Sequence, residues 1–400
     1  MTVEKVAARR HPAMTAHAWH YGVIALIAFL TLVDLFAAQA ILPSLVKEFD
    51  VSPAAMGFAV NASTFGMAAA GLAVAFFGRN LDRRNGIWIS LVILALPTTL
   101  LAFTHDLTLF AVLRVAQGVC MATAFTLTMA YLAEHFEAGA ATGVLAAYVT
   151  GNVASNFFGR LLSAAVAETL GLSLNFLTFA GLNLAGAIVV WVTLSRNEDL
   201  LTTESSGAAV SGGAWKLPLA DAQLRASFAI GFLILFVFIG TFTYVNFHLT
   251  AQPLSLSPMA LGLVYFVFLP SMVTTPLAGR LTTRLGARHG ILATLALAVA
   301  GLAMLISPSL PAVLAGLMLV AVGTFLAQAM ATGHVSRTAR SERAAASGIY
   351  LASYYAGGLA GGFVLGITYD GFGWNACVAV LAAATLVAMF VARRLSSPDA

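Results

Sequence analysis

Twelve apolar runs, each about as long as a membrane-spanning helix, divide this sequence almost from end to end. A helix needs about 20 apolar residues to cross the hydrocarbon core of a bilayer. The runs lie at 21–43, 55–77, 87–104, 108–132, 141–164, 172–194, 225–249, 259–279, 289–307, 311–333, 345–367 and 374–392. Most connections between them are short. We therefore predict an all-α membrane protein with twelve transmembrane helices.

Composition argues against a soluble protein and against a nucleic-acid or metal site. Of the 400 residues, 60% are hydrophobic and only 9% are charged, which is too little charge to cover the surface of a soluble domain. The net charge of +4 is small and dispersed, so we predict contact with the lipid bilayer and none with nucleic acid. Cys120 and Cys377 both lie in apolar runs and have no metal-ligand spacing.

A polar segment near the middle divides the runs into six and six. Residues 195–224 contain Thr-Thr-Glu-Ser-Ser-Gly and Ser-Gly-Gly, a composition typical of a linker. We predict a cytoplasmic N-terminal tail at 1–20, a six-helix bundle at 21–194, a second at 225–392 and a cytoplasmic tail at 393–400. The linker is too short to contain a soluble catalytic domain.

The distribution of basic residues sets the predicted orientation. With the N-terminus inside, 17 of the 20 lysines and arginines fall in inner segments, and only Lys47 falls in an outer loop. Arg114 and Arg160 lie within apolar runs. Because basic residues stay on the cytoplasmic side, both termini are predicted to be cytoplasmic. Arginine-rich, lysine-poor composition with abundant alanine and glycine favours a GC-rich bacterium, and therefore a cell inner membrane.

Short motifs in three different helices of the first half recur about 200 residues later. The pairs are 52–57 with 257–262, 78–86 with 279–288, and 141–143 with 346–348. Nearly one offset at three separate places indicates a duplicated six-span unit, and parallel repeats of this kind are a known transporter architecture. Two pseudo-symmetric six-helix bundles are therefore predicted.

The repeated charged turn resembles a signature of the major facilitator superfamily. That signature, Gly-x-x-x-Asp-Arg-x-Gly-Arg-Arg/Lys, follows the second span of family members. Here it is matched by Gly78, Asp82, Arg83 and Gly86, with one residue too many before the last glycine. The second copy has better spacing but lacks the acid; its matching residues are Gly279, Arg284, Gly286 and Arg288.

Other spans extend this resemblance over the whole chain. Arg114-x-x-Gln117-Gly118 matches the family's fourth-span signature, Arg-x-x-Gln-Gly. The segments 350–362 and 373–375 resemble the branch labelled arabinose-efflux-permease-like, which includes drug:proton antiporters. The fifth span departs from the antiporter motif Gly-x-x-x-Gly-Pro-x-x-Gly-Gly, because it has no proline and Asn156 interrupts the glycine pair. That departure weakens an inference to drug export.

The resemblance implies a monomeric secondary transporter that moves a small organic solute by alternating access. The branch favours proton-coupled efflux, that is, antiport. A proton-coupled uptake symporter for a sugar or an organic acid is the alternative, and a non-transporting membrane sensor or an intramembrane enzyme is the alternative from another class. The sequence contains no ATP-binding loop, no zinc-protease helix motif and no nucleophile elbow. We therefore predict neither an enzyme nor a bound cofactor or metal.

Asp34 is the predicted proton-coupling residue. It is the only acid well inside an apolar run, near the middle of the first span. A charge at that depth must pair, face water or be neutralised by a proton. Arg114 in the fourth span lies at a similar depth, so we predict that it pairs with Asp34. The resemblance also implies a proton-relay or substrate role for Arg114, whereas a purely structural ion pair remains the alternative.

Polar residues in several other spans are candidates for solute binding. A small polar or amphipathic solute suits amide and tyrosine side chains, although each of these could equally serve helix packing. The candidates are Gln39, Gln117, Asn152, Asn156, Tyr244, Asn246, Gln328, Tyr350 and Tyr354. Gly151, Ser155 and Gly159 repeat every four residues and predict a small-residue face for close helix packing. Arg160 is expected to extend towards the membrane surface.

The two charged turns are candidates for a gate at the inner face. Asp82 lies among Arg79, Arg83 and Arg84, so we predict a salt-bridge network there. The resemblance implies that such a network holds the inner gate shut when the outer side is open. The predicted gating residues are Gly78, Asp82, Arg83, Gly279, Arg284 and Arg288. The alternative is that these charges only determine the topology.

Overall fold

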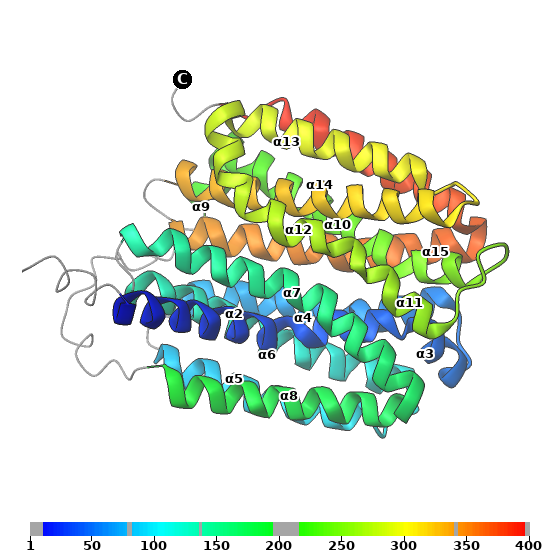
Figure 1. Ribbon diagram of the computed structural model, residues 1–400. Helices are drawn as coiled ribbons and strands as arrows, with labels where there is room; N and C mark the ends of the chain where they lie inside the picture. Colours follow the sequence, from blue (N-terminus) through cyan, green and yellow to red (C-terminus); the bar gives the residue numbers. More distant parts are fainter. Residues whose placement is uncertain (1–10, 78–81, 136–137, 195–215, 340–342, 397–400) are drawn as a thin grey trace, which may run out of the picture.

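The computed structural model describes residues 11–77, 82–135, 138–194, 216–339 and 343–396, and every regular element in these ranges is a helix. The long helices lie side by side along the molecule (Figure 1). They form two bundles of six spans, the first coloured blue to green and the second green to red. The predicted all-α membrane protein with twelve transmembrane helices is confirmed.

The first bundle contains six long helices and one short one. They are α2 (His11–Ala40), α3 (Leu42–Phe49), α4 (Pro53–Phe77), α5 (Arg83–Leu101), α6 (Leu107–His135), α7 (Ala138–Leu170) and α8 (Leu172–Thr193). The short helix, α3, connects the first span to the second. Pro53 begins α4 and Asp82 precedes α5, because proline fits the first helical turn and an aspartate side chain accepts hydrogen bonds from its free N–H groups.

The second bundle contains more interruptions. Its elements are α9 (Lys216–Ala220), α10 (Ala222–Thr250), α11 (Pro258–Val264), η2 (Tyr265–Phe268), α12 (Leu269–Thr274), η3 (Thr275–Leu277), α13 (Ala278–Met304), α14 (Leu310–Thr338) and α15 (Arg343–Ala392). The eighth span runs from α11 into the first turns of α13. Pro270 and Pro276 lie within it. Proline has no N–H to continue the helical ladder, which explains why this span is broken into short pieces.

Two glycines divide helices that would otherwise be far longer than a membrane is thick. Gly286 in α13 has φ 74° and ψ 162°, and Gly373 in α15 has φ 76° and ψ −172°. Such positive φ angles favour glycine, which has no Cβ. Each glycine ends one span and begins the next. Nine helical stretches in the described residues are long and apolar enough to span a membrane; two of them are these double spans, and α7 is the twelfth span.

The helix boundaries differ from the predicted ones at two segments. The first helix, α2, begins at His11, inside the predicted tail 1–20. Within the predicted linker 195–224, α9 forms a short helix and α10 already begins at Ala222. Residues 195–215 lie outside the described part. The helices extend further because polar residues continue a helix beyond the apolar run from which its position was predicted.

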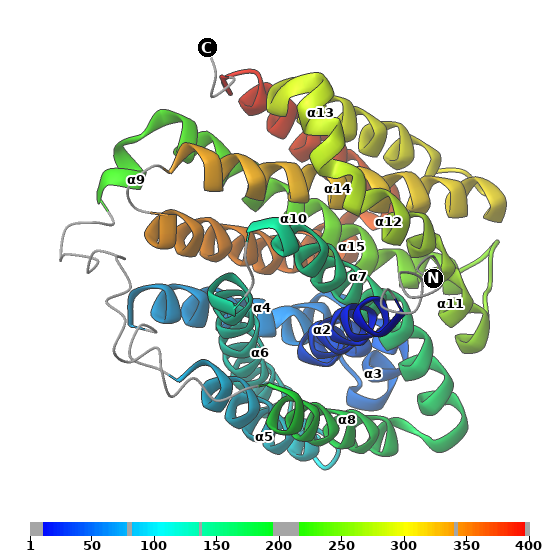
Figure 2. The same ribbon diagram turned by 60° about the vertical axis from the view of Figure 1, so that its left-hand side comes forward.

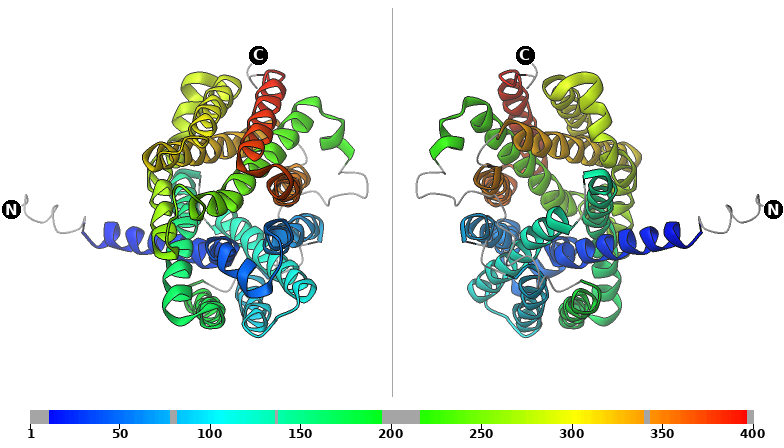
Figure 3. Two further views of the ribbon diagram at one scale, coloured as in Figure 1. Left: turned by 90° about the vertical axis from the view of Figure 1, so that its right-hand side faces the viewer. Right: turned by 90° about the vertical axis from the view of Figure 1, so that its left-hand side faces the viewer.

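The two ends of the molecule are easily distinguished. One end carries α3 and residues 251–257, and we call it the α3 end. The opposite end carries α9 and the start of α5 at Asp82, and we call it the α9 end (Figure 1). Figure 3 looks along the helices from the α3 end and from the α9 end. The predicted orientation puts the α3 end outside the cell.

The bundles meet mainly where α4 packs against α15 and where α7 packs against α11, η2, α12 and η3. The helix α10 also contacts α2, α3 and α4 of the first bundle. In Figure 2, α7 lies between α2 of the first bundle and α11 of the second, on the boundary between the bundles. Among the nine apolar stretches, α10 is the most enclosed, because 83% of its membrane-length segment is buried. Contacts that α10 makes with the first bundle must therefore change when one bundle moves against the other.

Within the first bundle, glycines allow helices to touch backbone to backbone. A Cβ at Gly118 in α6 would lie 1.9 Å from the Ser63 carbonyl oxygen of α4. A Cβ at Gly151 in α7 would lie 2.1 Å from the Ala25 carbonyl oxygen of α2, and one at Gly159 would lie 2.9 Å from Val33. The predicted small-residue face of the fifth span is confirmed, and it packs against the first span.

Replacing Gly118 with alanine should destabilise the protein by about 2 kcal/mol. The obstacle to the new methyl group is a backbone carbonyl, so α4 and α6 must move apart. Thermal unfolding of the purified protein measures the change. Gly181→Ala is the matched control, because a Cβ there meets nothing within 4 Å. Equal melting temperatures for the two variants would contradict the close contact between α4 and α6.

Candidate functional site

Asp34 lies deep in α2, with only 3% of its surface exposed. The nearest polar groups to its Oδ1 are the Thr98 hydroxyl and the Gln117 side-chain amide, both at 3.5 Å. Contacts of that length are weak hydrogen bonds at best. The second oxygen, Oδ2, is buried and has no hydrogen-bond partner among the described residues. The carboxyl group is therefore enclosed but poorly satisfied.

Neutral side chains from three other helices surround this carboxyl group. Gln117 of α6 donates to the Thr98 hydroxyl at 2.7 Å, and Asn183 of α8 donates to the same oxygen at 3.3 Å. The Thr98 hydroxyl proton goes to the Leu94 carbonyl at 2.8 Å, so it is not available to Asp34. We call Asp34, Thr98, Gln117 and Asn183 the Asp34 cluster. It joins α2, α5, α6 and α8 inside the first bundle.

Arg114 lies beside this cluster, but its guanidinium does not pair with the carboxylate. Its hydrogen bonds go to Gln117 Oε1 (2.7 Å), Val60 O (2.9 Å), Ser63 Oγ (3.0 Å), Asp34 O (3.2 Å) and Leu35 O (3.4 Å). Three of the five acceptors are backbone carbonyls. The prediction that Arg114 pairs with the Asp34 side chain is wrong. The close approach of α4 at Gly118, one turn beyond Arg114, brings the α4 backbone within reach of the guanidinium instead.

A second polar group, which we call the interbundle cluster, lies between the two bundles. Gln39 donates from its side chain to Asn61 Oδ1 at 2.8 Å, and Asn61 donates to the Thr243 hydroxyl at 3.2 Å. Asn246 donates to the Gln39 backbone carbonyl at 2.9 Å and accepts from the Tyr265 hydroxyl at 2.6 Å. All five residues are buried. This chain of bonds joins α2 and α4 to α10 and η2.

Tyr244 closes the same region. Its hydroxyl donates to the Gly362 carbonyl of α15 at 2.6 Å. A Cβ at Gly57 of α4 would lie 2.3 Å from the Tyr244 hydroxyl oxygen. Towards the α3 end, the Ala54 backbone N–H donates to the Asp370 carboxylate at 3.3 Å. Tyr244 therefore fills the contact between α4 and α15 and is not exposed to a solute in this conformation.

Arg160 belongs to the interbundle cluster and does not reach the membrane surface. It is fully buried, and its Nη2 donates to Gln39 Oε1. The expectation of a surface-directed side chain is wrong because α7 continues to Leu170. Arg160 thus lies ten residues from the end of its helix, and not four residues from the end of the predicted run at 164. Its Nε and Nη1 have no partner among the described residues.

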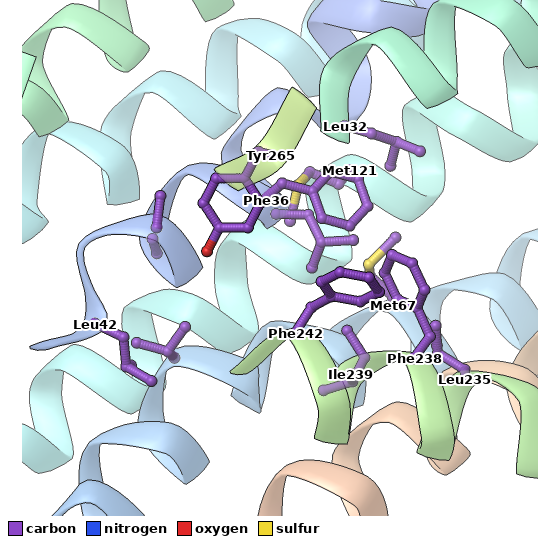
Figure 4. Packing of buried hydrophobic residues seen from close by; sticks show 14 of the residues in the cluster. Leu32, Phe36, Leu42, Met67, Met121, Leu235, Phe238, Ile239, Phe242 and Tyr265 are labelled. Atoms are coloured by element: carbon purple, nitrogen blue, oxygen red, sulfur yellow. The ribbon is translucent and has the colours of Figure 1, made fainter. Parts of the chain in front are cut away.

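Five aromatic rings enclose the Arg160 guanidinium. The distances from its Cζ to the ring centroids are 4.6 Å for Tyr265, 5.0 Å for Phe268, 5.3 Å for Phe36, 5.4 Å for Phe242 and 6.0 Å for Phe238. Figure 4 shows four of these side chains close together between the bundles. We call the five rings the aromatic cage. Only Phe36 comes from the first bundle.

The other predicted solute-binding residues lie elsewhere. Asn152 and Asn156 lie on α7, and the side-chain Oδ1 of each is buried without a described partner. In the second bundle, Tyr350 of α15 donates to Gln328 Oε1 of α14 at 2.7 Å, and its ring stacks on Tyr354 with centroids 6.3 Å apart. Most of the predicted residues therefore form three groups, which are the Asp34 cluster, the interbundle cluster, and the tyrosine pair with Gln328. Asn152 and Asn156 lie outside these groups.

The first charged turn caps a helix. Asp82 accepts hydrogen bonds from the Asn85 backbone N–H at 3.0 Å and the Asn85 side chain at 2.9 Å, at the start of α5. Arg83 is the first residue of α5, and Arg84 donates to the Trp191 carbonyl of α8. Gly78 lies outside the described residues. The Asp82 carboxylate thus caps α5, and Arg79, one of the arginines predicted to pair with it, lies outside the described residues.

The second charged turn is built differently. Gly279 lies within the eighth span, and a Cβ there would meet nothing within 4 Å. Arg284 and Arg288 are exposed on either side of Gly286, where the chain turns between spans. The two turns therefore occupy equivalent places at the α9 end, but only the first contains a capping carboxylate.

Sequence reasoning missed Asn183 and the aromatic cage. Asn183 is a buried amide in an otherwise apolar run, the same signal that identified Asn152 and Asn156. The cage could not be read from the sequence, because its rings come from α2, α10 and η2, far apart in the chain.

Comparison with known proteins places this chain among membrane transporters. A family model of the Major Facilitator Superfamily matches residues 24–272 and 247–400. The chain is 26% identical over 379 residues to the uncharacterized MFS-type transporter YybF of Bacillus subtilis (strain 168), covering 93% of each chain. It is 28% identical to the inner membrane transport protein YnfM of Escherichia coli (strain K12), covering 90% of this chain and 86% of YnfM.

A solved structure shares the fold. The crystal structure of a bacterial homolog of the human lysosomal transporter Spinster, in an inward-facing and unoccupied conformation, superposes with a TM-score of 0.74. The comparison covers 94% of this chain and 97% of that one, at 14% sequence identity. This likeness concerns the arrangement of the helices.

Proposed function

Because this chain belongs to the Major Facilitator Superfamily, we propose that it is a proton-coupled secondary transporter that exports a small organic solute. Its multi-pass architecture and its transporter relatives establish membrane transport of a solute as the general activity. Proton coupling, export and the residues that perform them are the proposal. The branch that the sequence resembles favours export, and proton-coupled uptake is the competing direction.

The observation that carries the coupling proposal is the unsatisfied Asp34 carboxyl group. A buried carboxylate needs a cation or several donors, whereas a neutral carboxylic acid needs far less. The neighbouring cation, Arg114, donates to five other oxygens and to neither carboxylate oxygen. A proton on Asp34 would therefore neutralise a charge that its surroundings compensate only in part.

Asn183 supports the same proposal. Its side chain donates to the Thr98 hydroxyl, which lies 3.5 Å from Asp34 Oδ1. Both Asp34 Oδ2 and Asn183 Oδ1 are buried acceptors without a described donor. A proton on Asp34 Oδ2 would turn one of these unsatisfied acceptors into a donor. In our proposal, the first bundle holds the transported proton between α2 and α8.

The interbundle cluster is the proposed gate at the α3 end. The cross-bundle hydrogen bonds among the described residues join Gln39 to Asn246, Asn61 to Thr243, and Ala54 to Asp370. All three lie in the halves of their helices that are nearer the α3 end. In alternating access the two ends open in turn, so these bonds must break when the α3 end opens. With the predicted orientation, this conformation is closed to the outside.

Flux into proteoliposomes under an imposed pH gradient tests the proposed function. Radiolabelled sugars, organic acids and hydrophobic amines form the solute panel. We expect at least one solute to move against its concentration gradient, in the direction opposite to the proton gradient. Movement with the proton gradient would replace export by uptake. If no solute responds to the gradient while one still binds the purified protein, the transport proposal fails and a sensor gains support.

The charge of Asp82 has a separate proposed role in gating at the α9 end. Asparagine caps a helix about as well as aspartate, so Asp82→Asn removes the charge and keeps the cap. We expect thermal stability to stay within about 0.5 kcal/mol of wild type and transport to slow. Asp106→Asn is the matched control, because Asp106 caps α6 at the α3 end through the Leu109 N–H. Equal transport rates for both variants would contradict a gating role for the Asp82 charge and would support helix capping as its function.

A further inference from the structure

Arg160 is a buried cation for which the described residues provide no counter-charge. Its side chain is fully buried, and no aspartate or glutamate among the described residues lies within ion-pair distance of it. It donates one hydrogen bond, to Gln39, and its Nε and Nη1 have no partner. Burying a charge without an opposite charge or a full set of hydrogen bonds is strongly unfavourable. The rest of the stabilisation must come from the aromatic cage.

Arg114 shows what a permanently buried arginine looks like in this molecule. Its guanidinium donates to five oxygens from α2, α4 and α6. Both arginines belong to the first bundle and are equally buried. Arg160 has one oxygen partner where Arg114 has five. Arg160 is therefore not held by the first bundle alone in the way that Arg114 is.

The cage belongs mainly to the opposite bundle. Tyr265, Phe268, Phe242 and Phe238 lie on η2 and α10, and the first bundle contributes Phe36. Aromatic faces attract a guanidinium, and the attraction is strongest when water is excluded. When the bundles separate at the α3 end, four of the five rings move away from Arg160. The guanidinium then keeps only Gln39 and Phe36 as near neighbours.

We propose that Arg160 binds the carboxylate of an aromatic organic anion when the α3 end is open. The planar guanidinium with two unused donors matches a carboxylate, which accepts two parallel hydrogen bonds. The ring of Phe36, which stays with Arg160 in the first bundle, provides an apolar face for the aromatic body. The ligand anion and the cage thus stabilise Arg160 in alternate conformations, so Arg160 acts where an exported anion is released on the outer side. This inference rests on the alternating-access transport proposed above.

Equilibrium binding of radiolabelled benzoate to the purified full-length protein tests the proposal. Phenylacetate and cinnamate extend the probe set, benzamide is the neutral isostere, and acetate is the carboxylate without a ring. We expect benzoate or one of its two analogues to bind, benzamide not to compete and acetate to compete weakly. Absence of binding by all three aromatic acids at millimolar concentration, or equal competition by benzamide, would overturn the proposal.

Variants of Arg160 locate the site. Arg160→Gln should weaken binding by at least about 30-fold, because a desolvated charge pair is lost. Its melting temperature should not fall below that of the wild type, because the variant removes an uncompensated buried charge. Arg160→Lys should retain part of the affinity, because it retains the charge. Unchanged benzoate affinity in Arg160→Gln would overturn the assignment of Arg160.

The cage provides an independent measurement. Phe268→Leu removes one ring from the closed conformation, so the open conformation becomes more populated and benzoate should bind about fivefold more tightly. Phe179→Leu is the matched control, because Phe179 is equally buried but packs with Val33 and Ala37 inside the first bundle. Equal affinity changes in both variants would show that the cage does not compete with the anion.

These binding measurements use no pH gradient, so they test the anion site independently of the proton-coupling proposal. If benzoate binding depends on Arg160 but no flux responds to a pH gradient, proton coupling is contradicted and the anion site is supported. If a pH gradient drives transport of neutral solutes only and benzoate does not bind, the anion site is contradicted and proton coupling is supported.

Discussion

Replacing Asp34 with asparagine should reduce pH-driven solute flux to that of protein-free vesicles while the protein stays folded. Asparagine has nearly the same size as the neutral acid, and its side-chain oxygen can accept from the Gln117 amide, but it cannot carry a proton across the membrane. Because no proton can compete with the solute at asparagine, the variant should still exchange labelled for unlabelled solute without a gradient. That exchange should no longer depend on pH. Flux in proteoliposomes, with and without a gradient, measures both effects.

Asp106→Asn is the control for this variant, because it removes an exposed acid and retains the α6 cap. It should leave pH-driven flux unchanged. Wild-type flux in Asp34→Asn would show that another group carries the proton. Loss of gradient-free exchange together with driven flux would instead indicate that Asp34 is needed for solute binding or for folding.

Arg114→Lys should prevent stable folding, although it keeps the positive charge. Lysine has three donors on one nitrogen and cannot reach the carbonyls and side chains that the guanidinium joins on α2, α4 and α6. Each buried acceptor left without a donor costs about 1–3 kcal/mol, so we expect a loss of about 3 kcal/mol or more. Size-exclusion chromatography and thermal unfolding in detergent measure the loss.

Arg284→Lys is the matched control, because Arg284 is exposed at the α9 end. Its melting temperature should equal that of the wild type. If Arg114→Lys is as stable as the wild type but loses only pH dependence, then Arg114 relays protons, and its contacts with the backbone are secondary. The hydrogen bonds of Arg114 instead favour a mainly structural role, in which it joins α2, α4 and α6.

The number and order of the spans could be predicted because a membrane imposes one strong requirement on each helix. About 20 apolar residues are needed per crossing, and twelve such runs are visible. The breaks at Gly286 and Gly373 also fall between predicted runs. Helix ends were predicted less well. Polar residues continue a helix into the interface, so α7 extends to Leu170 and places Arg160 in the interior.

The depth of Asp34 could be predicted, but its partners could not. An acid in an apolar run is rare enough to identify from sequence alone. The partners of Arg114 are mainly backbone carbonyls, which every residue has and which therefore leave no signal in the sequence. The environment of Arg160 depends on rings from α2, α10 and η2 that meet only when the two bundles pack together.

The central claim, that solute and proton share one transport cycle through Asp34, can be measured in a single binding experiment. Purified protein in weakly buffered solution, with a pH-indicator dye, is titrated with the solute that the flux assay identifies. We predict that saturation of the wild type releases about one proton per protein, because linked binding is reciprocal, and that Asp34→Asn releases none. No pH change in the wild type, or equal release from both proteins, would contradict the claim.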